Sequence, residues 1–328
     1  MPTVALSVPA IARVHRPRPR TTARGRAPIR VARASAAGAP DEASAGGGAS
    51  SSESDALRKC AIAFVDRHVS SGDRVGIGAG PMVSLVLGEI HDRLADSRLD
   101  DVQAVPTGTL TAKEAAVAGV PVTTLENVPA VDVCVLQADE AVTYRSEKSP
   151  GIAAIVGREQ RPVQPDLILT RKVIEKSVKV VLLVPALGDP IPLGGSVPVA
   201  IVGGQSEWEE CAEELDDIFL GDADVWRRGA EVEANPRGGK SPYLSADGAH
   251  TIVDLRFNDP LNDGGRWDDG FQLFGSAATP YQIAAEVETV DGVLAHGIVT
   301  QADSVMWPDA SDASGVGEFV LANKGLSR

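Results

Sequence analysis

The sequence has few of the residues that build metal centres, disulfide frameworks or membrane spans. It contains only three cysteines, and none belongs to a C-x-x-C pair, which excludes a zinc ribbon and a thioredoxin-type site. The five histidines are scattered without an H-E-x-x-H motif, so a metallohydrolase is disfavoured and we expect no metal. No apolar run approaches the roughly 20 residues of a membrane-spanning helix, so we expect no membrane partner.

Acidic residues are absent from the first 40 positions, which hold eight arginines and many Ala, Ser, Thr and Pro. This composition is typical of an organelle transit peptide, and a basic nucleic-acid-binding tail is the alternative. Residues 31–34 (VARA) resemble a plastid processing region, so we expect the chloroplast stroma, with the mitochondrion second. All 45 acidic residues follow position 40, and so acidic a body would repel nucleic acid. The Ala/Gly/Ser-rich residues 41–54 predict a flexible linker.

From residue 55 onward, helical patterns alternate with short apolar runs. The helical spacing covers residues 57–68, 81–95, 111–118 and 166–178. The apolar runs cover residues 74–79, 102–106, 120–125, 131–136 and 179–185. Near-continuous apolar strands that alternate with helices predict a parallel sheet covered on both faces.

The pattern changes after about residue 197. Strands are predicted over 197–202, 223–228, 251–257 and 293–299, and helices over 206–219 and 279–289. Their β-α-β-β-α-β order is that of a ferredoxin-like unit. A last apolar segment, 303–307, could return to the first sheet. The sequence thus predicts an α/β fold. A Rossmann-like doubly wound domain (55–196 plus about 300–308) carries a smaller α+β lid (197–299), and a tail follows (309–328).

A glycine-rich turn, V-G-I-G-A-G-P-M over residues 75–82, joins the first predicted strand to a helix. Such a turn presents backbone N–H groups to an anion, although a tight turn without a ligand fits equally well. The G-x-G-x-x-G fingerprint fails, because Pro81 or Val83 occupies its last glycine position. A nicotinamide-binding protein is therefore disfavoured, and we expect no cofactor.

Several short motifs between residues 55 and 307 occur together in one order. They are VGIGAG (75–80), VPTG (105–108), GVPV (119–122), ADE (138–140), RE (158–159), GV (292–293) and HG (296–297). The ordered set resembles the ribose-5-phosphate isomerase A family. The resemblance implies a Rossmann-like domain with a lid. It also implies an aldose–ketose isomerase that interconverts ribose 5-phosphate and ribulose 5-phosphate in the pentose phosphate pathway and the Calvin cycle.

The resemblance also implies site residues. It places catalytic groups at Glu159, as the base, and at Asp139 and Lys148. It places substrate- and phosphate-binding groups at Gly78, Gly80, Thr107, Thr111 and Glu140.

Other family positions are not kept. A family carboxylate falls on Leu136 and the next glycine on Gln137, while Ala79, Pro81 and Met82 replace phosphate-binding hydroxyls. Pro81 also lacks an N–H donor. We therefore expect an isomerase-like protein with an eroded catalytic and phosphate site. The alternative is a non-catalytic binding or assembly module that keeps the fold.

Three further expectations concern partners and packing. We expect His296 to be a packed or a surface histidine rather than a catalytic one. The segment 258–277, with Trp267, Phe271 and Phe274, is a candidate for binding a protein partner, unless its rings cover the core of the lid. A sugar phosphate is the expected small-molecule partner, and we expect a homo-oligomer.

Overall fold

The computed structural model describes residues 51–145, 150–158, 164–187, 193–230, 241–257 and 270–321. Lys148, Glu159 and Trp267 lie outside these residues, as does the predicted transit peptide.

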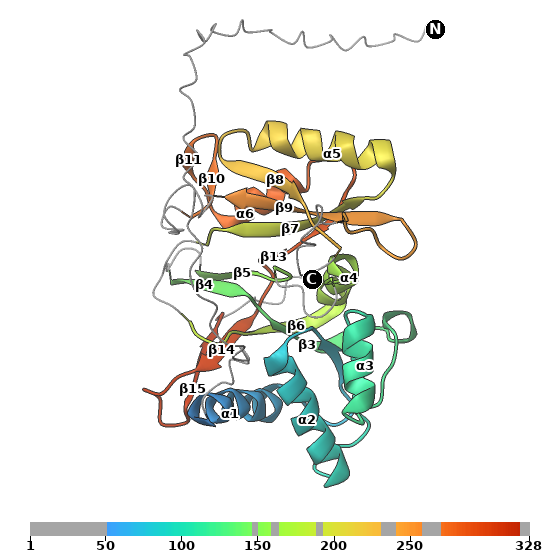
Figure 1. Ribbon diagram of the computed structural model, residues 1–328. Helices are drawn as coiled ribbons and strands as arrows, with labels where there is room; N and C mark the ends of the chain where they lie inside the picture. The colour runs from blue at the N-terminus through green and yellow to red at the C-terminus, as the bar shows by residue number, and fades with distance from the viewer. Residues whose placement is uncertain are drawn as a thin grey trace, which may run out of the picture. The chain divides into compact units, whose positions relative to one another are not determined.

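The largest sheet among the described residues has six strands in the order β15-β14-β6-β3-β1-β2 (Figure 1). Its strands are β1 (Arg74–Ile77), β2 (Gln103–Pro106), β3 (Val131–Gln137), β6 (Ser177–Leu183), β14 (Ser304–Pro308) and β15 (Val316–Val320). Five strands are parallel, and β15 pairs with β14 in the antiparallel sense. The expected return of the 303–307 segment to this sheet is confirmed, because β14 pairs with β6.

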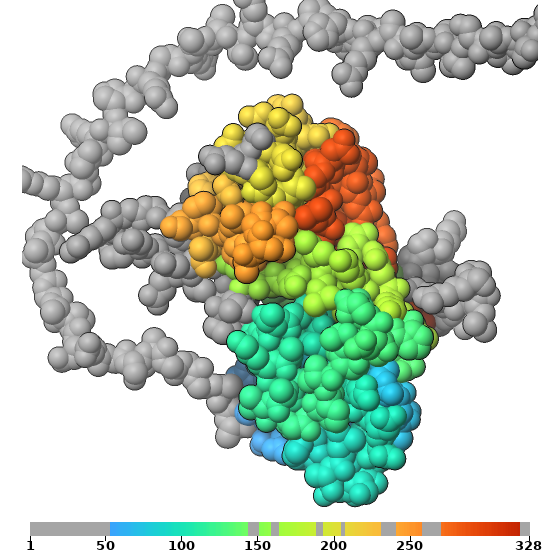
Figure 2. Space-filling view, turned by 90° about the vertical axis from the view of Figure 1, so that its right-hand side faces the viewer, coloured from blue at the N-terminus to red at the C-terminus, as the bar shows by residue number. Residues whose placement is uncertain are grey.

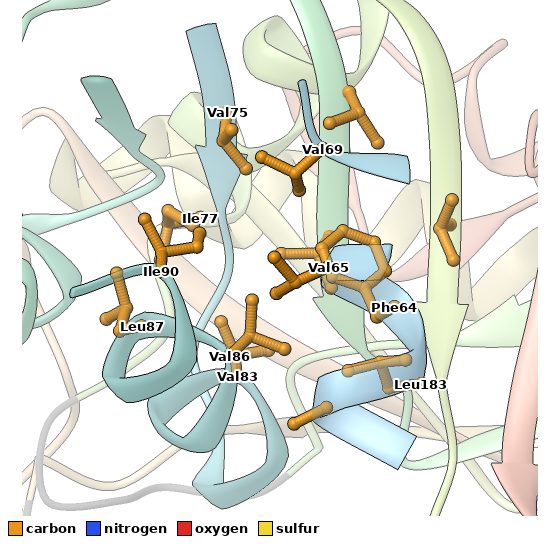
Figure 3. Packing of buried hydrophobic residues seen from close by; sticks show 14 of the residues in the cluster. Phe64, Val65, Val69, Val75, Ile77, Val83, Val86, Leu87, Ile90 and Leu183 are labelled. Carbon is orange, nitrogen blue, oxygen red and sulfur yellow. The ribbon is translucent and has the colours of Figure 1, made fainter. Parts of the chain in front are cut away.

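Both faces of this sheet are covered. Along β3, Val133 and Val135 join the core under α1 (Ser51–His68) and α2 (Pro81–Ala95). Figure 3 shows that core, with Phe64 of α1 and Val86 of α2 packed towards the strands. The intervening Cys134 and Leu136 face the opposite core, which includes Val173 of α4 (Leu167–Lys176). Burial on both faces is what the near-continuous apolar strands predicted.

A second, three-stranded sheet adds to the α4 side. It contains β4 (Glu140–Arg145), β5 (Pro150–Ile155) and β13 (Ile298–Val299) in the order β13-β5-β4. Ile152 and Ala154 of β5 belong to the same core as Leu136. Helix α3 (Thr109–Val117) packs beside β2 and α2.

The third unit is a four-stranded antiparallel sheet with the order β12-β7-β9-β8. In chain order it runs β7 (Ser196–Val202), α5 (Gln205–Ile218), β8 (Ala223–Arg227), β9 (His250–Phe257), α6 (Pro280–Val287) and β12 (Val293–His296). A two-residue ribbon, β10 (Gln272–Leu273) with β11 (Ser276–Ala277), precedes α6. This is the ferredoxin-like plan. The α/β fold with a smaller α+β lid is thus confirmed.

Two predicted strands are wrong in detail. Residues 120–125 contribute only a bridge between Ala104 and Val122, followed by a 3-10 turn (Leu125–Asn127). The side chains there are mostly exposed, and Pro121 has no N–H for a ladder. The predicted strand 293–299 is two strands in different sheets, separated at Gly297. A Cβ at Gly297 would lie 2.3 Å from the Val156 carbonyl oxygen, so only glycine permits this close crossing.

The aromatic rings of the 258–277 segment have two different environments. Phe271 is 1% exposed, and its ring centroid lies 4.9 Å from that of Phe257 in the lid core. Phe274 is 73% exposed. Phe271 therefore covers the core, as the alternative expected, while the proposed partner surface stays a prediction for Phe274.

Candidate functional site

A cavity of about 750 Å³ lies at the carboxyl ends of β1, β2 and β3. Because β1 lies between β2 and β3, the chain reverses direction across the sheet at this point, which is where open α/β sheets bind ligands. The amino ends of α2, α3 and α4 contribute to the wall, and the loop of residues 243–250 forms the lid side. In Figure 2 this orange loop lies above the green surface of α3.

The glycine turn after β1 forms one wall, but the start of α2 is already bonded within the chain. The Met82 N–H donates to the Gln137 side-chain oxygen at 2.8 Å, and Pro81 has no N–H. Gly80 caps the helix with φ 131°, and a Cβ there would lie 2.5 Å from the same Gln137 oxygen. Two of the first three helical residues thus offer no free donor to an anion.

Leu136 closes the base of this turn. It is 3% exposed and belongs to the core beneath α4, yet it also borders the cavity. A Cβ at Gly78 would lie 2.7 Å from the Leu136 Cδ2 atom, so the side chain rests against the turn. The position at which the family pattern has a carboxylate is therefore an apolar wall.

Thr107 and Thr111 lie in the second wall, at the start of α3. The Thr107 N–H donates to the Ile77 carbonyl at 3.0 Å and so joins the ends of β1 and β2. The Thr111 hydroxyl accepts from the Gly108 N–H at 3.1 Å and lies 2.9 Å from the Gly108 carbonyl. Thr111 is 2% exposed, so its hydroxyl fixes the start of the helix.

Of the two predicted acidic residues after β3, only Asp139 lines the cavity. Its Oδ2 atom accepts from the Arg158 N–H at 2.9 Å. Glu140 points to the Arg158 guanidinium, with 2.6 Å between Oε2 and Nη1. Lys148 and Glu159 lie outside the described residues, so the cavity brings together Gly78, Gly80, Thr107, Thr111 and Asp139.

Glu114 of α3 is a cavity residue that the sequence patterns did not indicate. Its Oε2 atom is buried, and no described residue forms a hydrogen bond with it. Burial raises the pKa of this carboxyl above its ordinary value. No sequence signal marks it, because an acid on an amphipathic helix usually faces solvent.

The lid contributes Tyr243, Asp247 and His250, which sequence reasoning also missed. Burial raises the pKa of Tyr243, and the negative charge of Asp166 raises it further. The Ser245 hydroxyl and the Ala249 N–H bind the Asp247 carboxylate and lower its pKa. Their stretch, SPYLSADGAH, has the composition of a turn and gave no motif.

Buried Arg228 connects the lid to the cavity floor. Its guanidinium forms a two-pronged ion pair with Asp254, including Nε to Oδ2 at 3.0 Å. The Nη1 atom donates to the Gly157 carbonyl at 2.9 Å, and the Gln164 side-chain nitrogen donates to the Gly229 carbonyl at 3.0 Å. These bonds hold Gly157 and Gln164 against the lid.

His296 is packed away from this cavity. It is 8% exposed, and burial lowers its pKa. Its Nδ1 atom accepts from the Ile298 N–H at 3.2 Å, and its Nε2 atom lies 3.0 Å from Glu288 Oε1 and 3.1 Å from Arg171 Nη1. His296 is thus packed, which is one of the two environments expected for it.

The described residues hold no cluster of three His, Cys, Asp or Glu side chains that could bind a metal ion. No helix among them combines the length and apolar character that spanning a membrane requires.

Comparison with known proteins gives one consistent result. A family model described as ribose 5-phosphate isomerase A (phosphoriboisomerase A) matches residues 103–311. The ribose-5-phosphate isomerase A of Roseiflexus sp. (strain RS-1) is 29% identical over 249 residues, which cover 75% of this chain and 88% of that protein. The Arabidopsis thaliana protein "Probable ribose-5-phosphate isomerase 3, chloroplastic" is 26% identical and covers 74% and 76%.

Solved structures agree with this fold. The ribose 5-phosphate isomerase from Plasmodium falciparum superposes with a TM-score of 0.60 at 22% identity, covering 81% of this chain and 98% of that one. The Methanocaldococcus jannaschii ribose 5-phosphate isomerase A gives 0.58 at 20% identity, covering 82% and 99%.

Proposed function

The chain belongs to the ribose 5-phosphate isomerase A family, and we propose that it keeps the ligand cavity of the family while isomerising ribose 5-phosphate only weakly. The reaction moves a proton between C1 and C2 of the sugar through an enediol. It needs a carboxylate base, a polar group at the developing oxyanion and an anion site for the phosphate.

The occupied glycine turn is the observation that carries this proposal. The Gln137 side-chain oxygen accepts a hydrogen bond from the Met82 N–H at 2.8 Å, and Leu136 is an apolar wall where the family pattern has a carboxylate. Losing one oxyanion donor alone lowers a rate by about 10²–10³. Glu159 as the proposed base, with Asp139 and Lys148 as further proposed catalytic groups, would still support slow turnover of ribose 5-phosphate.

Steady-state kinetics of the full chain test this proposal. We expect kcat/KM for ribose 5-phosphate to lie at least ~10³-fold below the 10⁴–10⁸ M⁻¹s⁻¹ range of ordinary enzymes. The Roseiflexus relative, assayed in parallel, is the control. Ordinary activity in the wild type that Glu159→Gln abolishes would overturn the proposal.

Ligand binding is favoured over a purely structural role by the cavity itself. It remains open at about 750 Å³, a volume within the range of small-molecule sites, and polar groups from both the main sheet and the lid border it. An assembly module that had lost its ligand would not need this space.

We also propose import into the plastid. The acid-free, arginine-rich residues 1–40 support it, and so does the chloroplastic Arabidopsis relative. Residues 1–50 fused to a fluorescent reporter provide the test. A mitochondrial, cytosolic or nuclear reporter would contradict plastid import.

A further inference from the structure

The described wall of the cavity is acidic. Four carboxylic acids line it, namely Glu114, Asp139, Asp166 and Asp247, together with one histidine, His250, whereas no described lining residue is a lysine or an arginine. Asp247 stays ionised because its pKa is lowered, and Asp166 is close enough to raise the pKa of Tyr243. The described part of the wall therefore holds more acidic than basic groups, which disfavours an anion as charged as a phosphate.

The two described arginines next to the cavity are committed elsewhere. The Arg158 guanidinium binds Glu140 and the carbonyl oxygens of Ser196 and Gly194. The Arg228 guanidinium binds Asp254 and the Gly157 carbonyl. Each already has partners for its charge, so neither can reach a ligand phosphate without breaking bonds that join the lid to the sheet.

The amino end of α2, which would otherwise bind a phosphate, is occupied by the Gln137 side chain. The Gln137 amide oxygen lies 2.8 Å from the Met82 nitrogen and packs against Gly80. A carbonyl-type oxygen satisfies the donor without bringing a negative charge. Gln137 is thus a neutral, built-in substitute for a phosphate oxygen at the start of α2.

The remaining wall suits hydroxyl groups. Carboxylate oxygens accept hydrogen bonds from hydroxyls. The Ser84, Thr170 and Ser245 hydroxyls donate their own protons to the Gly80 and Asp166 carbonyls and to the Asp247 carboxylate, and they can accept a bond from a ligand hydroxyl. Tyr243 adds a ring on the lid side. Such a mixture orients a polyhydroxylated molecule through several directional bonds without requiring charge.

We propose that this cavity selects an uncharged, polyhydroxylated ligand of sugar size and discriminates against its phosphate ester, with Gln137 as the residue that sets this preference. The proposal rests on the proposed function, because it concerns the same cavity, and it names the ligand class. Gln137 acts on binding of the ligand end that would carry the phosphate.

Isothermal titration calorimetry of the full chain tests the preference directly, with D-ribose, ribose 5-phosphate and inorganic phosphate as the probes. We expect ribose to bind at least about tenfold more tightly than ribose 5-phosphate, and phosphate alone to show no binding. Tighter binding of ribose 5-phosphate, or no binding of ribose, would overturn the proposal.

Two substitutions at one position assign the effect to Gln137. Gln137→Gly frees the Met82 N–H and should tighten ribose 5-phosphate binding by about tenfold while leaving ribose within about twofold. Gln137→Glu keeps the size and the acceptor but adds a charge, so it should weaken ribose 5-phosphate further and spare ribose. Equal effects on both ligands would show that Gln137 has only a structural role.

These results are separable from failure of the proposed function. Ordinary turnover of ribose 5-phosphate would overturn the weak-isomerase proposal through kinetics alone. The preference is decided by the ratio of the two dissociation constants, which does not depend on turnover.

Discussion

Gln137 and Met82 are joined by a hydrogen bond of 2.8 Å between the side-chain oxygen of one and the backbone nitrogen of the other. The bond connects the end of β3 to the start of α2 across 55 positions of sequence. It converts a potential anion site into an internal contact, because the donor is satisfied and the space next to Gly80 is filled. One side chain thus changes both the charge preference and the shape of the site.

Leu136→Asp should not restore activity. Leu136 is 3% exposed within the core, so the new carboxylate would be partly buried while the start of α2 stays blocked. We expect a loss of about 1–3 kcal/mol in the free energy of unfolding and little gain in kcat/KM. Urea unfolding and the isomerase assay measure both, with Leu136→Met as the volume-matched control. A large gain in kcat/KM would contradict this prediction.

Local sequence signals correctly predicted where several helices begin. The Gly80-Pro81 pair marks the start of α2, and the Asp166 and Thr279 side chains cap α4 and α6 next to where those helices were expected. Each signal acts within one turn of chain. Strands β4, β5 and β15 were not predicted from the sequence, because short segments such as residues 150–155 (PGIAAI) show no hydrophobic periodicity.

The site was less predictable for the same reason. Motif order placed Gly78, Thr107 and Asp139 along one cavity, since each follows a parallel strand. Nothing local indicates that Gln137 reaches the start of α2 or that the Glu114 Oε2 atom has no hydrogen-bond partner among the described residues. Those facts depend on distances between segments, which one sequence does not encode in any short motif.

Arg228→Ala should destabilise the lid strongly. Both Arg228 and Asp254 are buried, so removing the guanidinium leaves a carboxylate in the interior without its partner. We expect a loss of about 3–5 kcal/mol in the free energy of unfolding, measured by urea titration. Arg256→Ala, on the same sheet but exposed, removes only a contact with the Trp226 ring and should cost about 1 kcal/mol or less. Equal losses in the two variants would contradict a buried ion pair.

The three cysteines should be inert in the native protein. All are buried and free, and burial raises the pKa of Cys60 and Cys134 to about 12 and that of Cys211 to about 11. Because the thiolate is the reactive form, we expect a disulfide reagent to react at least ~10²-fold more slowly with the folded protein than with protein in urea. Rapid modification of one equivalent in the folded state would show that one site opens readily.

Glu318 should make stability depend on pH in the acid range. Its carboxylate binds His68 at 3.0 Å and Arg67 at 2.8 Å, and these contacts lower its pKa from 4.5 to about 2. Lys179 lies 2.8 Å from the other nitrogen of His68, which directs the proton of the neutral ring towards Glu318. These four groups connect β15 to α1 and β6.

The sign follows from proton binding. The folded state holds Glu318 ionised at pH values where the unfolded chain would protonate it, so the contribution is complete above about pH 4.5 and is lost towards pH 2. We expect Glu318→Gln to cost on the order of 2 kcal/mol near neutral pH and almost nothing at the acid end. Urea titrations of wild type and variant across this pH range give the difference in their free energies of unfolding. The contributions of the other titrating groups cancel in this difference. A difference that stays constant with pH would mean that Glu318 stabilises β15 through packing and not through its charge.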